Sequence, residues 1–472
     1  MKKIKESFTF DDVLMIPRKS GIFSRNDVST KTQLSKNIYL NVPIVSANMD
    51  TVTESRMARC MAEAGGIGII HRFLPIDIQA DEVRKVKRAE NVIIDEPYTI
   101  IAKESLEVAE RFMFQHNISG LPVIDEQKKV TGIITRKDIL FSKNKNVLVR
   151  DAMTKKVITA YPKISVANAK ELLFKHRIEK LPLVDSHGQL KGLITLKDML
   201  RQMAPSCASK DRRGRFMVGA AVGVKEEAKD RVRALLDAGA DVIVLDIAHG
   251  HSAHAMQTVK LLKQKFPGIE IVAGNIATPE GAIDLIKVGA DAVKVGVGPG
   301  AACITRIVTG VGVPQLSALL DIADKTKKYN IPIIADGGIR VSGDFAKALA
   351  AGGSSAMIGS LFAGTDEAPG EYILEDGVGY KLYRGMASRD ASEEKSRVDG
   401  GKDNIYRAPE GKSGKVSYRG HAKLVIEDLM SGLRSSMSYL GARNLKEFQK
   451  NAEFVRITQA GLRESRSHDM KS

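Results

Sequence analysis

The segment 242–298 contains three short β-rich runs in succession, VIVLDIAHG (242–250), IEIVAGN (269–275) and DAVKVGVG (291–298). Each run ends in small or polar residues and is followed by a helical pattern. Continuous Val, Ile and Leu runs that alternate with helices are typical of a parallel sheet covered by helices on both faces. The segment therefore predicts an α/β fold built on a parallel sheet.

Runs of the same kind recur on both sides of this segment and bring their number to eight, which is what a closed (β/α)₈ TIM barrel requires. Functional residues of such barrels lie where the strands end, so we expect the site there. The further runs are VPIVSANM (42–49), GIGIIH (66–71), FMVGAAVG (216–223), IPIIADGG (331–338) and SAMIGS (355–360). The residues at strand ends include Asn48, Asp246, Asn275, Asp336, Gly337 and Gly338.

An internal repeat interrupts the predicted barrel between its second and third strands. HNISGLPVIDEQKKVTGIITRKDIL (116–140) and HRIEKLPLVDSHGQLKGLITLKDML (176–200) align without a gap, each residue of the second unit following its counterpart by 60 positions. Each unit reads as a helix, a short apolar strand, a turn, a second strand and a helix opened by Thr. The repeat resembles a pair of CBS motifs, a Bateman module.

Length and composition agree with two domains. A chain of 472 residues with 43 % apolar content is too long for one ordinary domain and can bury a sizeable core. We predict that residues 1–90 form the first part of the catalytic barrel and 91–205 the tandem CBS domain. Residues 206–472 then form the remainder of the barrel, with an active-site loop at about 296–318 and a flap at about 386–414.

The cysteines and the N-terminus indicate a cytoplasmic protein. Cys60, Cys207 and Cys303 are far apart and lack the spacing of a zinc site or a disulfide framework, so we expect a reducing compartment. No run approaches the roughly 18 apolar residues of a membrane span, and the N-terminus has no apolar core of signal-peptide length. We therefore expect no membrane partner.

The net charge of +16 suits a polyanion or a phosphorylated substrate. The Lys and Arg residues are scattered, there is no Trp, and aromatic residues make up 5 %, so a stacking platform for single-stranded nucleic acid is poorly supported. We expect a solvated basic surface and no nucleic-acid partner.

The segment VGVGPGAACITRIVTGVGVPQLSA (295–318) is the most informative for chemistry. Gly296, Gly298 and Gly300 follow a predicted strand and let backbone groups approach a ligand or an ion. A Rossmann dinucleotide site is not indicated, because its third glycine would fall on Ala301 and no matching βαβ unit frames the motif.

Cys303 follows this glycine-rich run. A lone cysteine is ordinarily a small buried hydrophobe. The loop, together with Thr305 and Arg306, favours a different role, because a cysteine near donors that stabilise its thiolate can attack an electron-poor ring carbon.

Two later segments suggest a phosphate site and a flap. ADGGIR (335–340) and MIGS (357–360) end the last two strands with glycines and a serine, where (β/α)₈ barrels commonly bind phosphate. Tight barrel packing also favours glycine, but two such loops in this order favour phosphate. Residues 383–414 are charged and lack hydrophobic periodicity, which is typical of disorder or of a functional flap. Glu410 is there either a general acid or base, or an ordinary surface carboxylate.

The quoted motifs together resemble the IMP dehydrogenase and GMP reductase family across nearly the whole chain. The segments that carry the resemblance are TFDDVLMIP, SANMDTVTE, GGIGIIHR, VLDIAHGHS, VAGN, KVGVGPGAACITRIVTGVGVPQ, IADGGIR and YRGM. The family is a (β/α)₈ barrel, often with an inserted Bateman module.

The resemblance implies a role for individual residues. Cys303 corresponds to the nucleophile toward purine C2, with Thr305 and Glu410 as catalytic neighbours. The residues that correspond to substrate contacts are Met49, Asp336, Gly338, Gly359, Ser360, Tyr383, Gly385 and Met386. Asp246, Asn275, Lys294 and Gly296 correspond to nicotinamide cofactor positions, and Gly298, Gly300, Cys303 and Glu464 to a potassium site. One departure is Ala301, where the family has a Ser.

The resemblance leaves two reactions open. Dehydrogenases that resemble this chain activate water with an adjacent Arg-Tyr pair in the flap, whereas the nearest candidate here, Arg397, is followed by Val398. The missing pair favours GMP reductase, which converts GMP and NADPH to IMP, ammonia and NADP. The alternative is IMP dehydrogenase, which uses NAD and water to form XMP, and the C-terminal segment FVRITQAGLRESRSHDM (454–470) favours it.

A function of another class is nucleotide sensing through the repeat. ATP or GTP could bind near Asp138 and Asp198, each of which follows a Thr, or these residues could simply cap helices. A sensor without activity should have lost Cys303. The family resemblance also implies a homotetramer, with octamers possible when nucleotides fill the module.

Overall fold

The computed structural model describes residues 4–89, 93–94, 97–116, 118–142, 144–203, 207–391, 393 and 408–465. Within these residues the chain divides into two compact units. The first combines Met1–Ala89 with Cys207–Ser472, and the second is Glu90–Ser206.

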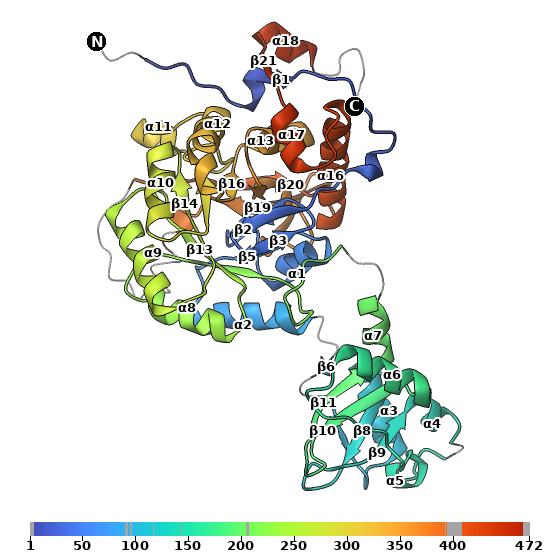
Figure 1. The fold of residues 1–472 in the computed structure, drawn as a ribbon. Coiled ribbons are helices and arrows are strands. Elements are labelled where there is room, and N and C mark those ends of the chain that lie inside the picture. The colour runs from blue at the N-terminus through green and yellow to red at the C-terminus, as the bar shows by residue number, and fades with distance from the viewer. Residues whose placement is uncertain are drawn as a thin grey trace. The chain divides into compact units, whose positions relative to one another are not determined.

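The first unit is a closed barrel of eight parallel strands (Figure 1). Each predicted run coincides with one barrel strand, of which only β14 extends past its run, by one residue, so the predicted (β/α)₈ barrel is confirmed. The chain leaves the barrel after its second strand and returns at its third, as the repeat indicated. In barrel order the strands are β12 (Gly219–Val222), β13 (Val242–Asp246), β14 (Ile271–Ile276), β15 (Ala292–Val295), β16 (Ile333–Asp336), β17 (Ser355–Ile358), β4 (Ile44–Ser46) and β5 (Ile67–Ile70).

The strands are buried because helices cover the outside of the ring (Figure 1). All residues of β5 and β12 are buried, which explains their continuous apolar sequence, and β15 is buried as well although it contains Lys294. The helices of this unit are α1 (Ser55–Glu63), α2 (Ile76–Arg88), α8 (Ala228–Asp237), α9 (Ala253–Lys265), α10 (Pro279–Lys287), α11 (Thr305–Thr309), α12 (Gln315–Thr326), α13 (Ser342–Ala350), α14 (Ser360–Ala363), α16 (Ala422–Tyr439), α17 (Leu445–Asn451) and α18 (Gln459–Glu464).

Local sequence sets where the helices begin. Thr278 caps α10 by accepting a hydrogen bond from the Gly281 amide, and Pro279 occupies the first helical position. Ser252 caps α9 in the same way through the Ala255 amide. The helix α9 follows β13, and α10 follows β14. The two caps therefore fix where the helix after each of these strands begins.

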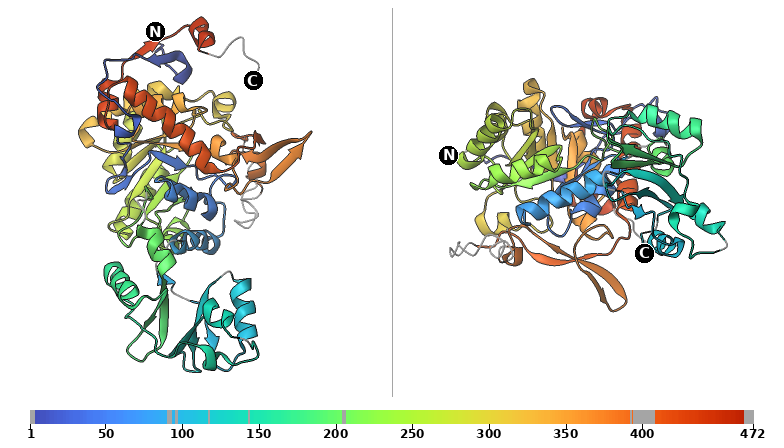
Figure 2. Two further views of the ribbon diagram at one scale, coloured as in Figure 1. Left: turned by 90° about the vertical axis from the view of Figure 1, so that its right-hand side faces the viewer. Right: turned by 90° about the horizontal axis from the view of Figure 1, so that it is seen from below.

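Additional strands extend the first unit beyond the barrel. The antiparallel sheet β18–β19–β20 projects from it as the orange hairpin in the left view of Figure 2. Its strands are β18 (Tyr372–Glu375), β19 (Val378–Arg384) and β20 (Ser413–Ser417); the remaining strands are β1 (Val13–Met15), which pairs with β21 (Phe454–Arg456), and β2 (Thr32–Ser35), which pairs with β3 (Ile38–Leu40). Short 3₁₀ turns are η1 (Phe10–Asp12), η2 (Arg25–Asp27) and η3 (Lys327–Tyr329).

The second unit has the helix–strand–strand–helix order expected for both repeats. The first repeat contains α3 (Leu106–Gln115), β8 (Gly120–Ile124), β9 (Val130–Thr135) and α4 (Arg136–Leu140). The second contains α6 (Val166–His176), β10 (Lys180–Val184), β11 (Leu190–Thr195) and α7 (Leu196–Met203). The unit also contains β6 (Ile93–Ile94), β7 (Ile100–Ile101) and α5 (Val149–Ala152).

Thr135 and Asp138 form a capping box at the start of α4. The Thr135 amide donates to Asp138 Oδ2 at 2.8 Å, and the Thr135 hydroxyl donates to the same oxygen at 2.7 Å. These two residues therefore cap a helix, one of the two roles considered for them. A nucleotide at this position, and at Asp198, stays a prediction.

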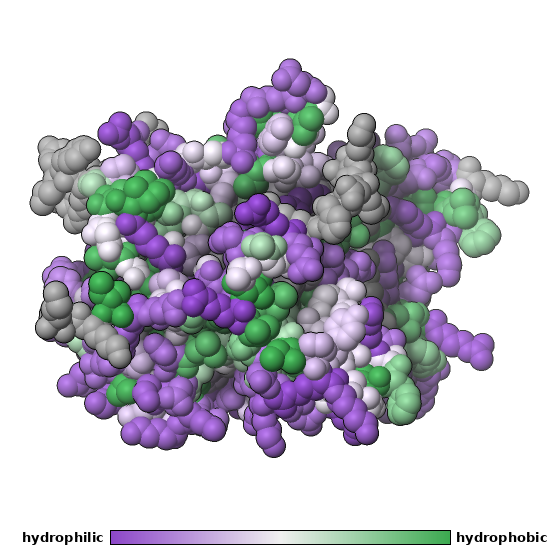
Figure 3. All heavy atoms as spheres, turned by 90° about the horizontal axis from the view of Figure 1, so that it is seen from above, coloured by the Kyte–Doolittle hydropathy of each residue, from purple (hydrophilic) through white to green (hydrophobic). Residues whose placement is uncertain are grey.

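The surface is largely polar. Figure 3 shows a mosaic in which hydrophilic residues predominate and hydrophobic residues form separate small patches. Within the described part of the chain, no helix combines the length and the apolar character needed to cross a bilayer.

Candidate active site

A cleft of about 500 Å³ opens where the barrel strands end. Nearly all the predicted site residues lie together on the wall of this cleft, although they come from segments far apart in the sequence. Those that line the cleft are Met49, Asp246, Asn275, Lys294, Gly296, Gly298, Gly300, Cys303, Thr305, Asp336, Gly338, Gly359, Ser360, Tyr383, Gly385, Met386 and Glu410. The volume is within the range of small-molecule sites.

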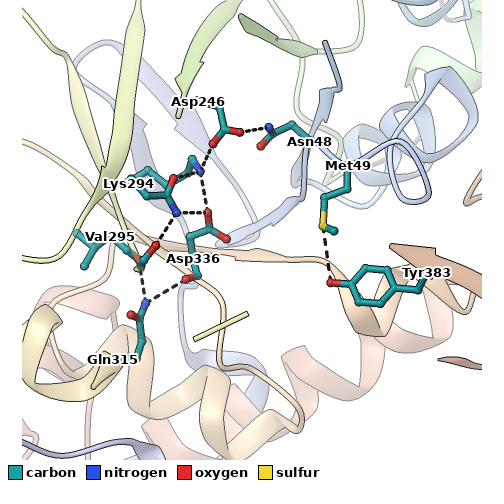
Figure 4. Close-up of polar contacts among 10 residues, drawn as sticks. Asn48, Met49, Asp246, Lys294, Val295, Gln315, Asp336 and Tyr383 are labelled. Carbon is teal, nitrogen blue, oxygen red and sulfur yellow. Dashed lines mark hydrogen bonds and ion pairs between the residues drawn. The ribbon is translucent and has the colours of Figure 1, made fainter. Parts of the chain in front are cut away.

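Lys294 lies at the centre of a polar network beneath this cleft (Figure 4). Its side chain is 1 % exposed, and its Nζ donates to Asp246 Oδ1 and Asp336 Oδ2, each at 2.7 Å. A third bond runs from Nζ to Asn275 Oδ1. The network therefore joins the ends of four neighbouring strands, β13, β14, β15 and β16.

The ion pairs outweigh the cost of burial. Burial lowers the pKa of Lys294, but the facing carboxylates of Asp246 and Asp336 raise it overall. Burial likewise raises the pKa of Asp246, yet Lys294, Arg72 and the amide of Asn48 lower it overall. Lys294 and Asp246 are therefore both charged at neutral pH.

Cys303 lies at the cleft and is partly exposed, as a nucleophile requires. Its Sγ is 3.1 Å from Thr305 Oγ1, at the start of α11. The alternative of a deeply buried hydrophobic cysteine is therefore inconsistent with the structure.

Arg306 holds the Cys303 loop in shape. Its Nε donates to the carbonyl of Val297 at 3.2 Å, and an Nη donates to the carbonyl of Val313. Gly298 has a φ of +87°, and a Cβ there would lie 2.5 Å from the Arg306 side chain. Glycine is thus required both by backbone conformation and by the close packing of Arg306.

The last residues of the predicted flap are joined to the same loop. The Ile304 amide donates to the Glu410 carbonyl at 2.8 Å, and the Lys412 amide donates to the Ala302 carbonyl at 2.9 Å. These bonds place the backbone of Glu410 beside the Cys303 loop, and Glu410 is one of the residues that line the cleft.

Three of the predicted phosphate and base contacts, Gly359, Tyr383 and Met49, are neighbours in the cleft. Gly359 precedes α14, and a Cβ there would lie 3.0 Å from the Tyr383 hydroxyl and 3.2 Å from Met49 Sδ. The Tyr383 hydroxyl is 3.7 Å from Met49 Sδ (Figure 4). Burial raises the pKa of the Tyr383 phenol, so it stays neutral and can donate a hydrogen bond.

The sequence did not reveal the ion pair between Asp50 and Arg384, which directly follow Met49 and Tyr383 in the chain. Arg384 Nε and an Nη donate to Asp50 Oδ2 at 2.7 and 2.6 Å, and the Arg384 amide donates to Thr51 Oγ1 at 3.3 Å. The pair is largely buried and ties the segment after Met49 to the segment after Tyr383. No local pattern could have revealed it, because the partners lie 334 residues apart.

Gln315 is a second residue that the sequence did not single out. Its Nε2 donates to the carbonyl of Val295 at 2.8 Å and to that of Asp336 at 3.2 Å (Figure 4). It thereby ties the ends of β15 and β16 together beside the cleft. Its position directly after the glycine-rich segment, in VPQLSA, was the available signal.

Two predicted residues are not part of this cleft. Arg397 lies outside the described residues, and Glu464 ends α18 and is not among the cleft-lining residues. Among the described residues no cluster of three or more His, Cys, Asp or Glu could hold a metal ion. The predicted potassium site relies on carbonyls: Gly300 accepts from the Cys303 amide at 3.0 Å.

Comparison with known proteins identifies similar sequences over the full length. Residues 7–468 match the family model described as IMP dehydrogenase / GMP reductase domain. The chain is 52 % identical over 474 residues to inosine-5'-monophosphate dehydrogenase of Nitrosopumilus maritimus, covering 99 % of both chains. It is also 52 % identical over 475 residues to the enzyme of the same name from Aquifex aeolicus, covering 100 % of this chain and 97 % of the relative.

The chain is also similar to solved structures of proteins named GMP reductase. A cysteine-to-alanine variant of GMP reductase from Trypanosoma brucei in complex with guanosine 5'-monophosphate has a TM-score of 0.91 and 43 % identity, with 99 % of both chains covered. GMP reductase from the same organism in complex with guanosine 5'-triphosphate has a TM-score of 0.80 and 40 % identity, covering 96 % of this chain and 98 % of that one.

Proposed function

Because the chain belongs to the IMP dehydrogenase and GMP reductase family of NAD(P)-dependent oxidoreductases, we propose that it is a GMP reductase that works through a covalent bond from Cys303 to purine C2. The observation that carries the choice is in the flap, residues 386–414. This segment contains no Arg-Tyr pair, so it lacks the base expected to activate water in the dehydrogenase direction.

The proposed reaction begins at Cys303. Its thiolate adds to C2 of GMP, while the 2-amino group gains a proton and leaves as ammonia. We assign the supply and relay of that proton to Thr305, whose Oγ1 is 3.1 Å from Sγ, and to Glu410, which lines the same cleft. NADPH, when bound, supplies the hydride that reduces C2, after which the thiolate leaves and IMP is released.

The remaining cleft residues would hold the two ligands. We assign the phosphate to Gly338, Gly359, Ser360 and Tyr383, the ribose hydroxyls to Asp336, and the base to Met49, Gly385 and Met386. Asp246, Asn275 and Gly296 lie on the adjoining wall of the same cleft and suit the nicotinamide half of the cofactor, since they offer carboxylate, amide and backbone groups.

Potassium suits the Cys303 loop. Within the described residues, the carbonyls of Gly298 and Cys303 accept no hydrogen bond, so these oxygens are available to a cation. We propose that they bind potassium with the carbonyl of Gly300 and Glu464 of the partner subunit. The ion would order the loop that carries the nucleophile. This arrangement needs a neighbouring subunit, and the assembly we propose is a homotetramer.

IMP dehydrogenase is the second candidate, favoured by the 52 % identical relatives of that name. In that reaction NAD accepts the hydride from C2, and water releases XMP from Cys303. One assay separates the two reactions: purified protein is given GMP with NADPH, or IMP with NAD. GMP-dependent loss of NADPH with release of ammonia supports the reductase. XMP formation from IMP, without GMP-dependent loss of NADPH, overturns the reductase proposal.

The second unit is proposed to bind ATP or GTP as a regulator. The support is its repeat architecture and the Trypanosoma brucei GMP reductase whose solved complex contains guanosine 5'-triphosphate. Adding each nucleotide while recording activity and sedimentation tests both regulation and the proposed change from tetramer to octamer. No change in either quantity would contradict the proposal.

A further inference from the structure

The three donors of the Lys294 ammonium are all engaged within the protein. They reach Asp246, Asn275 and Asp336, each on a different neighbouring strand. A lysine ammonium has three N–H donors and no acceptor. No donor of Lys294 is therefore left for a bound cofactor or nucleotide, although sequence reasoning placed this residue among the cofactor contacts.

The same bonds leave Asp336 with one free oxygen. Asp336 Oδ2 accepts from Lys294 Nζ at 2.7 Å and from Asn275 Nδ2 at 2.8 Å. Within the described part of the chain, Asp336 Oδ1 accepts no hydrogen bond, while the residue lines the cleft. Lys294 and Asn275 thus fix the carboxylate so that its second oxygen is available to a ligand.

Asp246 is oriented by the same ammonium. Its Oδ1 accepts from Lys294 at 2.7 Å, and its Oδ2 accepts from Asn48 Nδ2 at 3.0 Å. The ammonium therefore bridges two carboxylates of the cleft, which carry like charge and repel each other. Bringing like charges together in a buried place costs more than it does in water.

We infer that Lys294 is a positioning residue that fixes Asp336 for the nucleotide ribose and Asp246 for the cofactor at the same time, without touching either ligand. The inference rests on the proposed roles of these two carboxylates. It predicts that one substitution weakens binding of both ligands, whereas a residue that contacted only the cofactor would affect the cofactor alone.

The other groups around the ammonium do not replace it. Asn275 and Asn48 are neutral, and Arg72 acts on Asp246 from the end of β5. Tyr383 lies near Asp336 and is not a cation. Lys294 is therefore the positive charge that both carboxylates share.

The chain offers a matched control at the other end of the strands. Lys87 is 3 % exposed, and its Nζ lies 3.0 Å from Asp211 Oδ2 and 2.6 Å from Asp241 Oδ2. Asp241 directly precedes β13, whereas Asp246 ends it. Lys87 thus has the same chemistry as Lys294, but at the end of the barrel opposite the cleft.

The test compares Lys294→Met with Lys87→Met. Dissociation constants are measured by calorimetry, with GMP and IMP as nucleotides and NADPH and NAD as dinucleotides. Lys294→Met should weaken both a nucleotide and a dinucleotide by about ten-fold or more, because each loses a fixed charged acceptor. Lys87→Met should leave both affinities within about two-fold while lowering the melting temperature, since both variants lose a buried ion pair.

Lys294→Gln is the second variant, in case the methionine variant does not fold. Burial raises the pKa of Asp246, and the ammonium of Lys294 opposes this effect. Without the ammonium the pKa rises, so the carboxylate takes up a proton at higher pH. Dinucleotide affinity of Lys294→Gln should therefore fall as the pH is lowered, over a range in which that of the wild-type protein stays constant.

Three outcomes would overturn the inference: loss of dinucleotide affinity alone, unchanged affinity for both ligands, or equal losses in Lys87→Met. The reaction direction is judged separately on wild-type protein. If that protein makes XMP, the reductase proposal fails, while the Lys294 measurements continue with IMP and NAD.

Discussion

Cys303 Sγ and Thr305 Oγ1 lie 3.1 Å apart on the loop that follows β15. At this distance the hydroxyl can donate to the thiolate or pass a proton to a group leaving the carbon that the sulfur attacks. The two residues are therefore expected to act together, and their substitution effects should not be additive.

Replacing Thr305 by valine should lower kcat by about 100-fold, because the proton donor beside the sulfur is removed while the side-chain shape is kept. KM for the nucleotide should change little, since no phosphate or ribose contact is lost. Steady-state kinetics measure both, and Thr305→Ser should retain most of the activity. A valine variant with unchanged kcat would rule out the proton-transfer role.

Cys303→Ala should abolish turnover in both reaction directions, because no covalent adduct can form. The variant should still bind GMP or IMP, because the phosphate and ribose contacts come from other segments. Mass spectrometry of the wild-type protein during turnover should detect nucleotide mass on Cys303, and this mass should be missing from the variant. Residual turnover above the uncatalysed rate in Cys303→Ala would remove the covalent mechanism.

Arg306→Lys should lower kcat by about ten-fold although the charge is kept. Arginine reaches the carbonyls of Val297 and Val313 together, whereas a lysine point charge cannot span both. The loop that carries Cys303 would then lose its fixed shape. The matched control is Arg59→Lys, which alters an exposed i,i+4 pair with Glu63 and should leave kcat unchanged.

Asp50→Asn should raise KM for the nucleotide and lower the free energy of unfolding by about 3 kcal/mol, because it removes the charge from a largely buried ion pair with Arg384. The segments that carry Met49 and Tyr383 would be joined less firmly. Chemical denaturation and steady-state kinetics measure the two effects. Glu63→Gln, in an exposed pair, should cost less than about 1 kcal/mol, and an equal cost for both variants would contradict the structural role of Asp50.

The barrel could be predicted because its signal is local. Most of the strands are short, mainly apolar runs, so β13 was found within VIVLDIAHG and β16 within IPIIADGG. The predicted runs are longer than the strands: β13 ends at Asp246, and the residues that follow it, Ile247 to Gly250, turn into the cleft wall or the loop. Small and polar residues end the strand, but the sequence does not say at which of them the ladder stops.

The candidate site was predictable only where motifs are contiguous. Cys303, Thr305 and the glycines lie in one segment, so their proximity could be predicted from the sequence alone. The Asp50–Arg384 pair and the sharing of Lys294 between two carboxylates depend on which strand ends become neighbours. The closure of the barrel decides which strand ends are neighbours, and no single stretch of sequence contains that information.

The last prediction concerns pH and the thiol of Cys60 on α1. Burial, with a smaller contribution from Glu367 and Glu63, raises the pKa of Cys60 to about 12. The folded state therefore favours the neutral thiol. The resulting stabilisation is fully present below the pKa of the unfolded thiol, about 8.5, and is lost as pH rises toward 12.

Above pH 9, the wild-type protein should lose up to about 1 kcal/mol per pH unit that a Cys60→Ala variant does not lose, because full linkage gives about 1.4 kcal/mol per unit and Cys60 is partly exposed. Urea unfolding at pH 8, 9 and 10 measures the slope for both proteins. Cys207→Ala, which removes an exposed thiol, should show the wild-type slope. Parallel slopes for all three proteins would mean that Cys60 ionises as readily in the folded chain as in the unfolded one.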